Sequence, residues 1–235
     1  MLVYGKNVAK ELLKSKNKVK KVYIQNGFKD EDILNMLSTH KVNVVDKKTL
    51  DKLSNGTHQG IALEINDYNY YKESDLFEEL TDHSFIVILD HLEDPHNFGA
   101  IIRTCESAGV DFIVIPKDRS VKVNSTVMKV SAGTLDLVKI VEVVNINNFI
   151  NKLKKANTWI VGTRLEDSTS YTDVDYTSSV ALVIGNEGKG ISPLVEKNCD
   201  YLVKIPMIGK TNSLNASVAA GILIYEVVRQ RSNNG

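Results

Sequence analysis

The feature that most constrains this chain is a series of short apolar runs between residue 84 and the C-terminal end. The runs are nearly continuous, where a half-exposed strand would alternate apolar and polar residues. Such runs are typical of strands buried on both faces of a mostly parallel sheet. They are Phe85–Leu89, Phe112–Pro116, Leu137–Val144, Trp159–Thr163, Val180–Ile184 and Tyr201–Ile205. Helical patterns separate several of them, at Asn97–Ala108, Ile146–Ala156 and Leu214–Arg229. We therefore predict a doubly wound α/β domain over residues 84–235.

The first 65 residues form a second, smaller pattern. Helices are predicted at about 6–15, 30–39 and 47–53, and strands at 21–25, 42–46 and 60–65. A polar and aromatic stretch at 66–74 without a clear period then breaks the chain. We predict a small α/β domain at 1–66, a linker at 67–83 and the larger domain at 84–235.

The overall composition excludes several classes of protein. The 29 basic and 29 acidic residues give a net charge of zero, which excludes a polyelectrolyte or a binder held by bulk charge. No run approaches the ~18 apolar residues of a membrane span, and the first twenty residues do not resemble an export signal. The two cysteines, Cys105 and Cys199, lie far apart, which favours a reducing compartment. We expect a cytoplasmic protein without a membrane partner.

The zero net charge conceals an asymmetry between the two parts. Residues 1–70 hold 12 lysines and 8 acidic residues, whereas residues 71–235 have an excess of acidic residues. The lysines fit either a solvated helix face or a surface that attracts phosphate groups.

Three loops of the larger domain are unusual, and ligands of such sheets bind at the strand ends. The first follows Leu89, where Pro95 sets a turn and Asn97 can cap a helix that contains Gly99 and Arg103. A cap and a surface arginine would explain this loop, but the apolar neighbours of Arg103 argue against a purely solvated side chain. If Asn97 lies in the first turn, both residues can point toward one strand end.

The second loop, residues 185–190, reads Gly-Asn-Glu-Gly-Lys-Gly after a buried strand. The glycines permit close backbone approach, although a plain tight turn is the alternative. The spacing is neither a dinucleotide fingerprint nor a P-loop.

The third loop runs from Ile205 through Pro206 and Met207 to a polar segment, where Ser213 or Asn215 opens a helix of small residues. An ordinary N-cap accounts for one of these polar residues, but not for several together. Exposed amides at this helix start could receive an anionic group.

Other chemistries find little support. His91 and His96 lack the spacing of a metal pair, so no metal site is predicted. Cys105 lies on an apolar helix face and fits the core better than a nucleophile.

Taken together, the three loops resemble the three motifs of the SPOUT superfamily, in its SpoU/TrmH branch of RNA ribose 2′-O-methyltransferases. The resemblance rests on Asn97-x-Gly-x-x-x-Arg103, on Gly185-Asn-Glu-Gly-x-Gly190, and on Ile205-Pro-Met207 with Ser213-Leu-Asn-x-Ser217. The first 65 residues, opening Tyr4-Gly5 and closing His58-Gln59-Gly60, are similar to the substrate-binding domain of enzymes that methylate a guanosine of 23S ribosomal RNA.

The resemblance implies a fold and partners. The larger domain would contain a deep trefoil knot, a rare exception among folds, and the smaller one would be an α/β/α sandwich. The protein would bind S-adenosylmethionine in the knotted loops and ribosomal RNA in preference to transfer RNA. It would form a homodimer through the larger domain.

The resemblance also implies roles for particular residues. The catalytic set would be Asn97, Arg103, Glu187, Ser213 and Asn215. The cofactor pocket would use Thr163, Gly185, Glu187, Gly188, Ile205, Met207, Leu214 and Ala216.

The chemistry would be attack of a ribose 2′-hydroxyl on a sulfonium methyl group, whose sulfur leaves neutral. The hydroxyl is a weak acid, so positioning and stabilisation of the developing alkoxide should dominate. Arginine is a poor base because its pKa is above about 12. Arg103 therefore fits an electrostatic anchor best, and a deprotonated Arg103 acting as the base is the alternative. Two further classes of protein are less well supported. A catalytically silent RNA-binding protein would be favoured if Arg103 or Asn215 were replaced, but both are present. A nucleotide-binding oxidoreductase would need a dinucleotide fingerprint, which the sequence lacks.

Overall fold

The structure is a computed structural model that describes residues 1–14, 19–54, 56–186, 188–211 and 213–232. Its contacts divide the chain into two compact units. The N-terminal unit comprises Met1–Asn69 and Val123–Gly133, and the C-terminal unit comprises Tyr70–Lys122 and Thr134–Gly235. Each unit is described by itself below.

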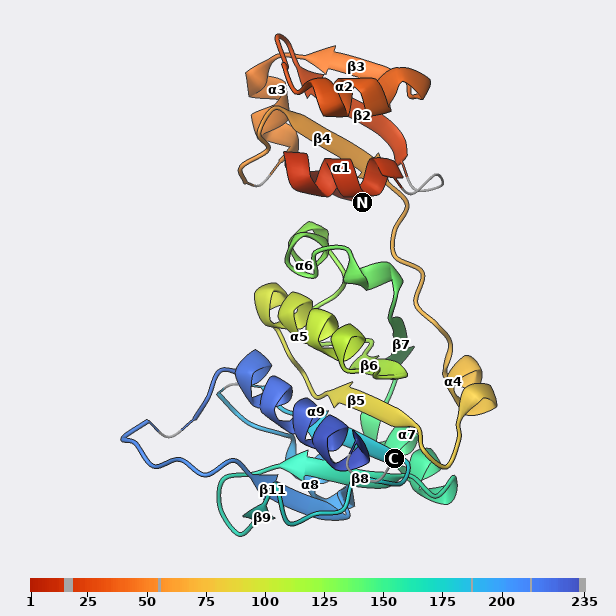
Figure 1. Cartoon of the computed structure of the whole chain (residues 1–235), viewed down its shortest axis with the longest axis vertical. Coiled ribbons are helices and arrows are strands. Elements are labelled where there is room, and N and C mark those ends of the chain that lie inside the picture. Colours follow the sequence, from red (N-terminus) through yellow and green to blue (C-terminus); the bar gives the residue numbers. More distant parts are fainter. Residues whose placement is uncertain (15–18, 55, 187, 212, 233–235) are drawn as a thin grey trace. The chain divides into compact units, whose positions relative to one another are not determined.

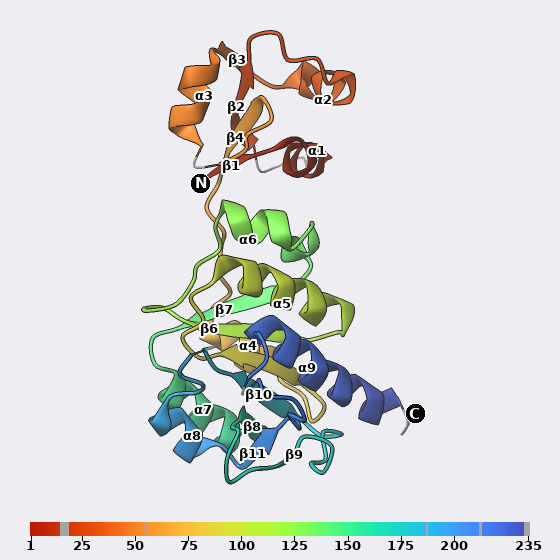
Figure 2. The same ribbon diagram turned by 90° about the vertical axis from the view of Figure 1, so that its left-hand side faces the viewer.

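The N-terminal unit is built on a four-stranded sheet in the order β1-β4-β2-β3. Strands β2 and β3 are parallel, whereas β4 runs antiparallel to both β1 and β2. The strands are β1 (Leu2–Tyr4), β2 (Val19–Gln25), β3 (Val42–Val45) and β4 (Ile61–Ile65). The helices are α1 (Lys6–Lys14), α2 (Glu31–Met36) with a 3₁₀ turn at Leu37–Thr39, α3 (Lys47–Leu53) and α6 (Ser125–Val130). Figure 2 shows α1 and α2 on one side of this sheet and α3 on the other, which gives the α/β/α sandwich.

Local sequence explains where two of these helices begin. The Asp30 carboxylate accepts a hydrogen bond from the backbone N–H of Ile33, and Asp46 accepts one from Thr49. Both aspartates are therefore N-caps, which satisfy amides left free in the first turn of a helix.

The C-terminal unit is built on a seven-stranded sheet in the order β7-β6-β5-β10-β8-β11-β9, and every pairing in it is parallel. The strands are β5 (Phe85–Leu89), β6 (Phe112–Pro116), β7 (Lys139–Val143), β8 (Trp159–Thr163), β9 (Thr169–Ser170), β10 (Val180–Ile184) and β11 (Tyr201–Lys204). All residues of β5, β6 and β10 are buried. The three runs that form β5, β6 and β10 are thus central strands of a covered sheet, as predicted, whereas β7 is an edge strand and β8 and β11 are partly exposed.

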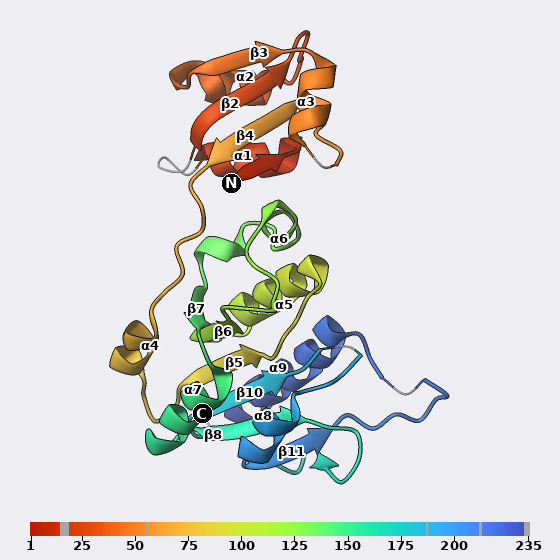
Figure 3. The same cartoon turned by 180° about the vertical axis from the view of Figure 1, so that it is seen from behind.

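Helices cover both faces of this sheet. On one face α5 (Pro95–Ser107) and α9 (Ala216–Ser232) pack against each other (Figure 1). On the other face lie α4 (Glu73–Glu79), α7 (Ile146–Lys155) and α8 (Pro193–Asn198), which are seen from behind in Figure 3. Leu76 of α4, Phe149 of α7 and Val195 of α8 share one core with the strands.

Several boundaries differ from the sequence prediction. Helix α5 begins at Pro95 and not at Asn97, because Asp94 is the N-cap and proline suits the first helical position. Helix α9 begins at Ala216 and not at Leu214. The short elements β1, α4, α6, α8 and β9 were not predicted from the pattern. Residues 67–83, expected to be a linker, contain α4 with its fully buried Leu76.

The predicted fold class, a small α/β domain together with a parallel-sheet α/β domain, is confirmed. The trefoil knot stays a prediction. Among the described residues, no helix is long and apolar enough to cross a membrane.

Candidate active site at the strand ends of the C-terminal unit

One pocket lies where β8, β10 and β11 end in the C-terminal unit. Its volume is about 520 Å³, within the range of ~300–1,000 Å³ common for small-molecule sites. Its walls are the segments that follow these strands and the first turn of α9. The lining residues are Thr163, Arg164, Leu165, Glu166, Ile184, Gly185, Asn186, Gly188, Lys189, Gly190, Ile191, Glu196, Val203, Lys204, Ile205, Met207, Ser213, Leu214, Ala216 and Ala219. The parallel sheet therefore brings together segments more than fifty residues apart.

The pocket gathers most of the residues that sequence analysis assigned to a cofactor. Seven of the eight line it: Thr163, Gly185, Gly188, Ile205, Met207, Leu214 and Ala216. The eighth, Glu187, lies outside the described residues, and the same applies to its predicted catalytic role. Ser213 of the predicted catalytic set also lines the pocket.

The glycine loop owes its shape to its own backbone. Asn186 N–H donates to the Gly190 carbonyl over 3.0 Å, and Gly190 N–H donates to the Asn186 carbonyl over 2.8 Å. A Cβ atom on Gly185 would lie 2.1 Å from the carbonyl carbon of Gly190, and Gly190 itself has a φ of +67°. Gly188 is different, because a Cβ there would meet only Asn186 Oδ1 at 3.7 Å. Gly185 is thus required by the fold of the loop, whereas Gly188 leaves open space at the pocket wall.

A buried aspartate, which sequence analysis did not single out, connects the first two loops. Asp90 follows β5 and is 1% exposed. Its carboxylate accepts a 2.6 Å bond from the N–H of Ser192, and its other oxygen lies 2.5 Å from Nδ1 of His91. Asn186 Nδ2 in turn donates to the His91 carbonyl over 3.2 Å. An acidic residue directly after a buried strand was the signal that could have identified it.

The first and third loops meet through two predicted catalytic residues. Asn215 Nδ2 donates to Asn97 Oδ1 over 2.9 Å, although 118 positions separate the two in the chain. Asn97 is buried in the first turn of α5, and its own amide nitrogen lies 3.3 Å from Asp94 Oδ2. Asn215 Oδ1 accepts bonds from the N–H and hydroxyl groups of Ser217, so that Asn215, and not Ser213, caps α9.

Arg103 lies elsewhere. Its side chain is exposed on α5 and does not line the pocket, whereas its neighbours Ile101, Ile102 and Cys105 face the core. Within the part of the chain that the structure describes, no hydrogen bond or ion pair engages the guanidinium. The apolar sequence around Arg103 thus reflects the inner face of α5, and the expectation of a non-solvated arginine is not met within one chain.

Among the described residues, three cations and two carboxylates line the pocket. Arg164 Nη1 donates to Glu196 Oε1 over 2.8 Å, and Lys189, Lys204 and Glu166 complete the charged lining. The apolar wall consists of Leu165, Ile184, Ile191, Val203, Ile205, Met207, Leu214, Ala216 and Ala219. Such a site can hold a flat apolar group against strand-end backbone and a charged group against the carboxylates.

The two thiols are unsuited to nucleophilic chemistry. Burial raises the pKa of Cys105 far above its ordinary value, and burial together with Asp200 raises the pKa of Cys199 to about 12. Both therefore stay protonated near neutral pH, as expected for Cys105 from its apolar helix face. Among the described residues there is no group of three or more His, Cys, Asp or Glu side chains that could hold a metal ion.

Comparisons with known proteins identify the family of this chain. The SpoU rRNA Methylase family matches residues 84–225, and the family described as RNA 2′-O ribose methyltransferase substrate binding matches residues 2–71. A TrmH family tRNA/rRNA methyltransferase of Staphylococcus epidermidis is 41% identical over 98% of this chain and 96% of its own length.

Solved structures show the same architecture. The SpoU methyltransferase AviRb from Streptomyces viridochromogenes, in complex with AdoMet, superposes with a TM-score of 0.82 and 24% identity over 99% of this chain and 90% of its own. The TrmH/SpoU tRNA modifying enzyme of A. aeolicus is 33% identical over 69% of this chain and 82% of its own, with a TM-score of 0.60. Fold, site and sequence together define an RNA methyltransferase. The chain belongs to the SpoU/TrmH family of these enzymes.

Proposed function

We propose that this protein transfers the methyl group of S-adenosylmethionine to a ribose 2′-hydroxyl of RNA, at a guanosine of 23S ribosomal RNA. The observation that carries the proposal is the meeting of three distant loops. The second and third loops, together with the end of β8, form one pocket from the residues assigned to the cofactor, and the first loop joins the third through the Asn97–Asn215 pair.

The lining of the pocket suits this cofactor in both its apolar and its charged parts. The apolar wall, which includes Ile205, Met207 and Leu214, could cover an adenine ring, and backbone groups at the strand ends could bond to its edge. Glu166 provides negative charge for a sulfonium or an ammonium group, whereas Glu196 is already paired with Arg164. When bound there, S-adenosylmethionine supplies an electrophilic methyl group on a sulfur that leaves without charge.

The residues of the chain would act on the other reactant. The 2′-hydroxyl is a weak acid that develops negative charge as it attacks, so groups that stabilise this charge lower the barrier. The Asn97–Asn215 pair is held in place by Asp94 and by the start of α9, and would orient the ribose without titrating. Ser213 at the pocket wall would contact the same nucleotide.

Arg103 would be the electrostatic anchor for the alkoxide and the adjoining phosphate. A guanidinium keeps its charge and offers a planar set of donors that matches such oxygens. Its exposed position on α5 leaves it available to RNA.

We further propose that the protein is a homodimer through the α5 and α9 face. Val218 and Tyr225, seven positions apart on α9, are 49% and 50% exposed and lie on the same side of that helix. A dimer formed there would cover these apolar side chains and bring the α5 helices, with Arg103, close to the second copy. Light scattering should report a dimer for the wild-type chain and a monomer for a Val218→Asp/Tyr225→Asp double variant.

Ribosomal RNA is favoured over transfer RNA because the N-terminal unit matches a substrate-binding family over residues 2–71 and carries the surplus of lysines. Such a substrate would place the reaction in the cytoplasm.

The test is transfer of labelled methyl groups to purified RNA under single-turnover conditions. We expect labelling of 23S ribosomal RNA that lacks modifications, and little labelling of transfer RNA. The labelled guanosine is located by the resistance of its phosphodiester bond to alkaline cleavage. Methylation of transfer RNA alone would show that transfer RNA, and not ribosomal RNA, is the substrate. Methylation of a base would refute the assignment of the 2′-hydroxyl as the methyl acceptor.

A further inference from the structure

A second pocket, of about 720 Å³, lies within the N-terminal unit. It is located where the parallel strands β2 and β3 end and β4 begins. The lining residues are Lys6, Gln25, Gly27, Phe28, Lys29, Lys47, Asp51, Gly56, Thr57, His58, Gln59 and Gly60. Neither the predicted site residues nor the chemistry proposed above involves this pocket.

A buried histidine at this pocket holds a carboxylate in a fixed place. The side chain of His58 is 8% exposed, and its Nδ1 accepts a 2.9 Å bond from the N–H of Gly60. Because Nδ1 is the acceptor, the proton of the neutral ring is on Nε2, which donates to Asp51 Oδ1 over 2.9 Å. This bond leaves Asp51 Oδ2 available at a side chain that is 54% exposed. The structure thus presents an oriented acceptor at the pocket.

An aromatic ring lies in the same pocket. Phe28 is half-buried, and its ring packs so closely on Gly60 that a Cβ there would be 2.9 Å from Phe28 Cδ2. Lys6 Nζ lies over this ring at 5.3 Å from its centroid and is also paired with Asp30 Oδ2 at 3.2 Å. A flat apolar surface beside a cation suits a nucleobase and its phosphate.

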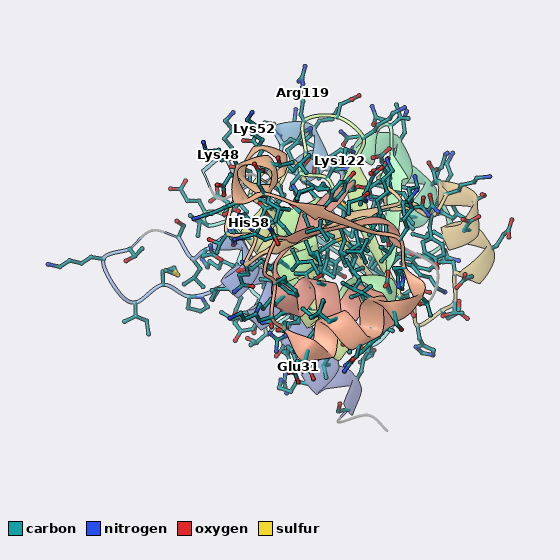
Figure 4. The ribbon with its side chains drawn as sticks, turned by 90° about the horizontal axis from the view of Figure 1, so that it is seen from above. Glu31, Lys48, Lys52, His58, Arg119 and Lys122 are labelled. Carbon is teal, nitrogen blue, oxygen red and sulfur yellow. The ribbon has the colours of Figure 1, made fainter. Side chains whose placement is uncertain are left out.

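Positive charge borders the pocket. Lys29 and Lys47 are exposed lining residues. Figure 4 shows Lys48 and Lys52 of α3 on the same side of the unit as His58, whereas Glu31 of α2 is on the opposite side. Lysines gathered at one end of the sheet attract a phosphate backbone, although Asp30 at the start of α2 is paired with Lys6 of the pocket at 3.2 Å.

We infer that this pocket binds one unstacked guanine nucleotide of the RNA substrate, at a position other than the methylated one. Phe28 stacks on the base, Lys29 and Lys47 contact the neighbouring phosphates, and the Asp51 carboxylate accepts from the base edge. The inference takes RNA as the ligand from the proposed function and requires nothing else of it.

The Asp51 carboxylate, a hydrogen-bond acceptor, favours guanine over the other bases. Its Watson–Crick edge presents two adjacent N–H donors, N1–H and N2–H, which Asp51 can accept with Oδ2 and with the second lone pair of Oδ1. Adenine and cytosine each pair one donor with an adjacent acceptor, and uracil flanks its single donor with two carbonyls. A fixed carboxylate would repel those acceptors, so the pocket selects guanine.

The experiment measures the binding of fluorescent single-stranded RNA heptamers to the full chain by anisotropy. Each heptamer has six uridines around a central G, A, C or U. We expect the G heptamer to bind about 5- to 100-fold more tightly than the others, the range typical of a bidentate base contact. Guanosine monophosphate is a second arm: tighter binding of the free nucleotide than of the heptamer would overturn the assignment to RNA.

Two substitutions separate base reading from stacking. Asp51→Asn preserves the acceptor for His58 but replaces the other oxygen with a donor, so the preference for G should fall to near unity. Binding of the A, C and U heptamers should not weaken. Phe28→Leu preserves apolar volume but removes the aromatic face, and should weaken all four heptamers by about 5- to 100-fold, whereas Phe28→Tyr should bind normally.

Matched controls lie outside the pocket. Glu31→Gln neutralises a carboxylate on the opposite side and should preserve the preference for G. Lys20→Ala/Lys41→Ala removes two exposed lysines where β2 and β3 begin, and should weaken binding less than Lys29→Ala/Lys47→Ala does. Thermal unfolding confirms that each variant folds.

The outcome can be distinguished from failure of the proposed function. A wild-type chain without preference for G, or an Asp51→Asn variant that retains it, would overturn the inference even if ribosomal RNA were methylated normally. Conversely, a G preference that depends on Asp51 would support the pocket even if the 2′-hydroxyl were not the methyl acceptor.

Discussion

At the scale of single residues, two glycines of one loop have different roles. Gly185 lies against the backbone of Gly190, whereas Gly188 borders the pocket with free space at its Cβ position. A side chain at the first would disrupt the loop, and a side chain at the second would project toward the place of a ligand.

This contrast gives a paired prediction. Gly188→Val should lower the affinity for S-adenosylhomocysteine by at least about tenfold while the melting temperature changes little, since surface substitutions usually cost under ~0.5 kcal/mol. Gly185→Ala should destabilise the unit itself, because its Cβ would lie 2.1 Å from another backbone atom. Calorimetry and thermal unfolding measure the two effects. Unchanged affinity in Gly188→Val would mean that the loop is only a tight turn.

Arg103 gives the second prediction at this scale. Removing one charged donor at a developing oxyanion costs on the order of 10²–10³ in rate, so Arg103→Ala should nearly abolish methyl transfer. Affinity for the cofactor should stay within a few-fold, because Arg103 does not line the pocket. Arg103→Lys should restore little activity, since an ammonium lacks the planar fork. Near-normal single-turnover rates in the alanine variant would remove Arg103 from the mechanism.

At the scale of elements, α9 carries both the site and a buried charge. Glu226 is 6% exposed, and its carboxylate accepts bonds from Arg229 Nε at 2.8 Å and Nη2 at 2.7 Å. The hydrogen bonds from Arg229 lower the pKa of Glu226 below its ordinary value of 4.5.

A pH dependence follows with a definite sign. A carboxyl whose pKa is lower in the folded state stabilises the fold above its unfolded pKa, and that contribution is lost as the pH falls through the folded pKa. Glu226→Gln should therefore lower the melting temperature at pH 7, and the difference from the wild-type chain should shrink below about pH 4.5. A difference that does not change with pH would assign the effect to packing and not to charge.

Elements were predictable where the pattern was long. The buried strands and the helices α1, α5, α7 and α9 follow from apolar periodicity, because each must face one core. Helix α4, with seven residues, and α8, with six, were not predicted, although α3, also with seven residues, was; packing on the sheet selects α4 and α8. At the candidate site, the location of the unusual loops at the ends of strands was enough to predict where the pocket lies. The position of Asp90 directly after a buried strand was a usable signal, but its partner Ser192, 102 residues away, could not be predicted.

At the scale of the whole molecule, we expect a division of labour between the two units. The boundary matters, since Leu76 of α4 is fully buried in the C-terminal core and Tyr71 N–H donates to the Ile140 carbonyl. A truncated chain should therefore begin at residue 70 and not at residue 84.

The corresponding prediction concerns such a chain of residues 70–235. It should bind S-adenosylhomocysteine within a few-fold of the full chain and lose most of its affinity for ribosomal RNA, because the surplus of lysines lies in residues 1–70. Calorimetry and filter binding measure the two quantities in parallel. Full RNA affinity in the truncated chain would place recognition in the C-terminal unit instead.

The hydrogen bonds that link the Asp90 segment to the glycine loop affect how such a site can be altered by engineering or by evolution. Asp90 holds the Ser192 amide after the glycine loop, and Asn186 within that loop holds the His91 carbonyl. A glycine loop grafted from a relative would therefore meet an anchor that it was not selected with. Useful variants should arise by exchanging both loops as a single cassette, and libraries that randomise one of them alone should yield mostly inactive proteins.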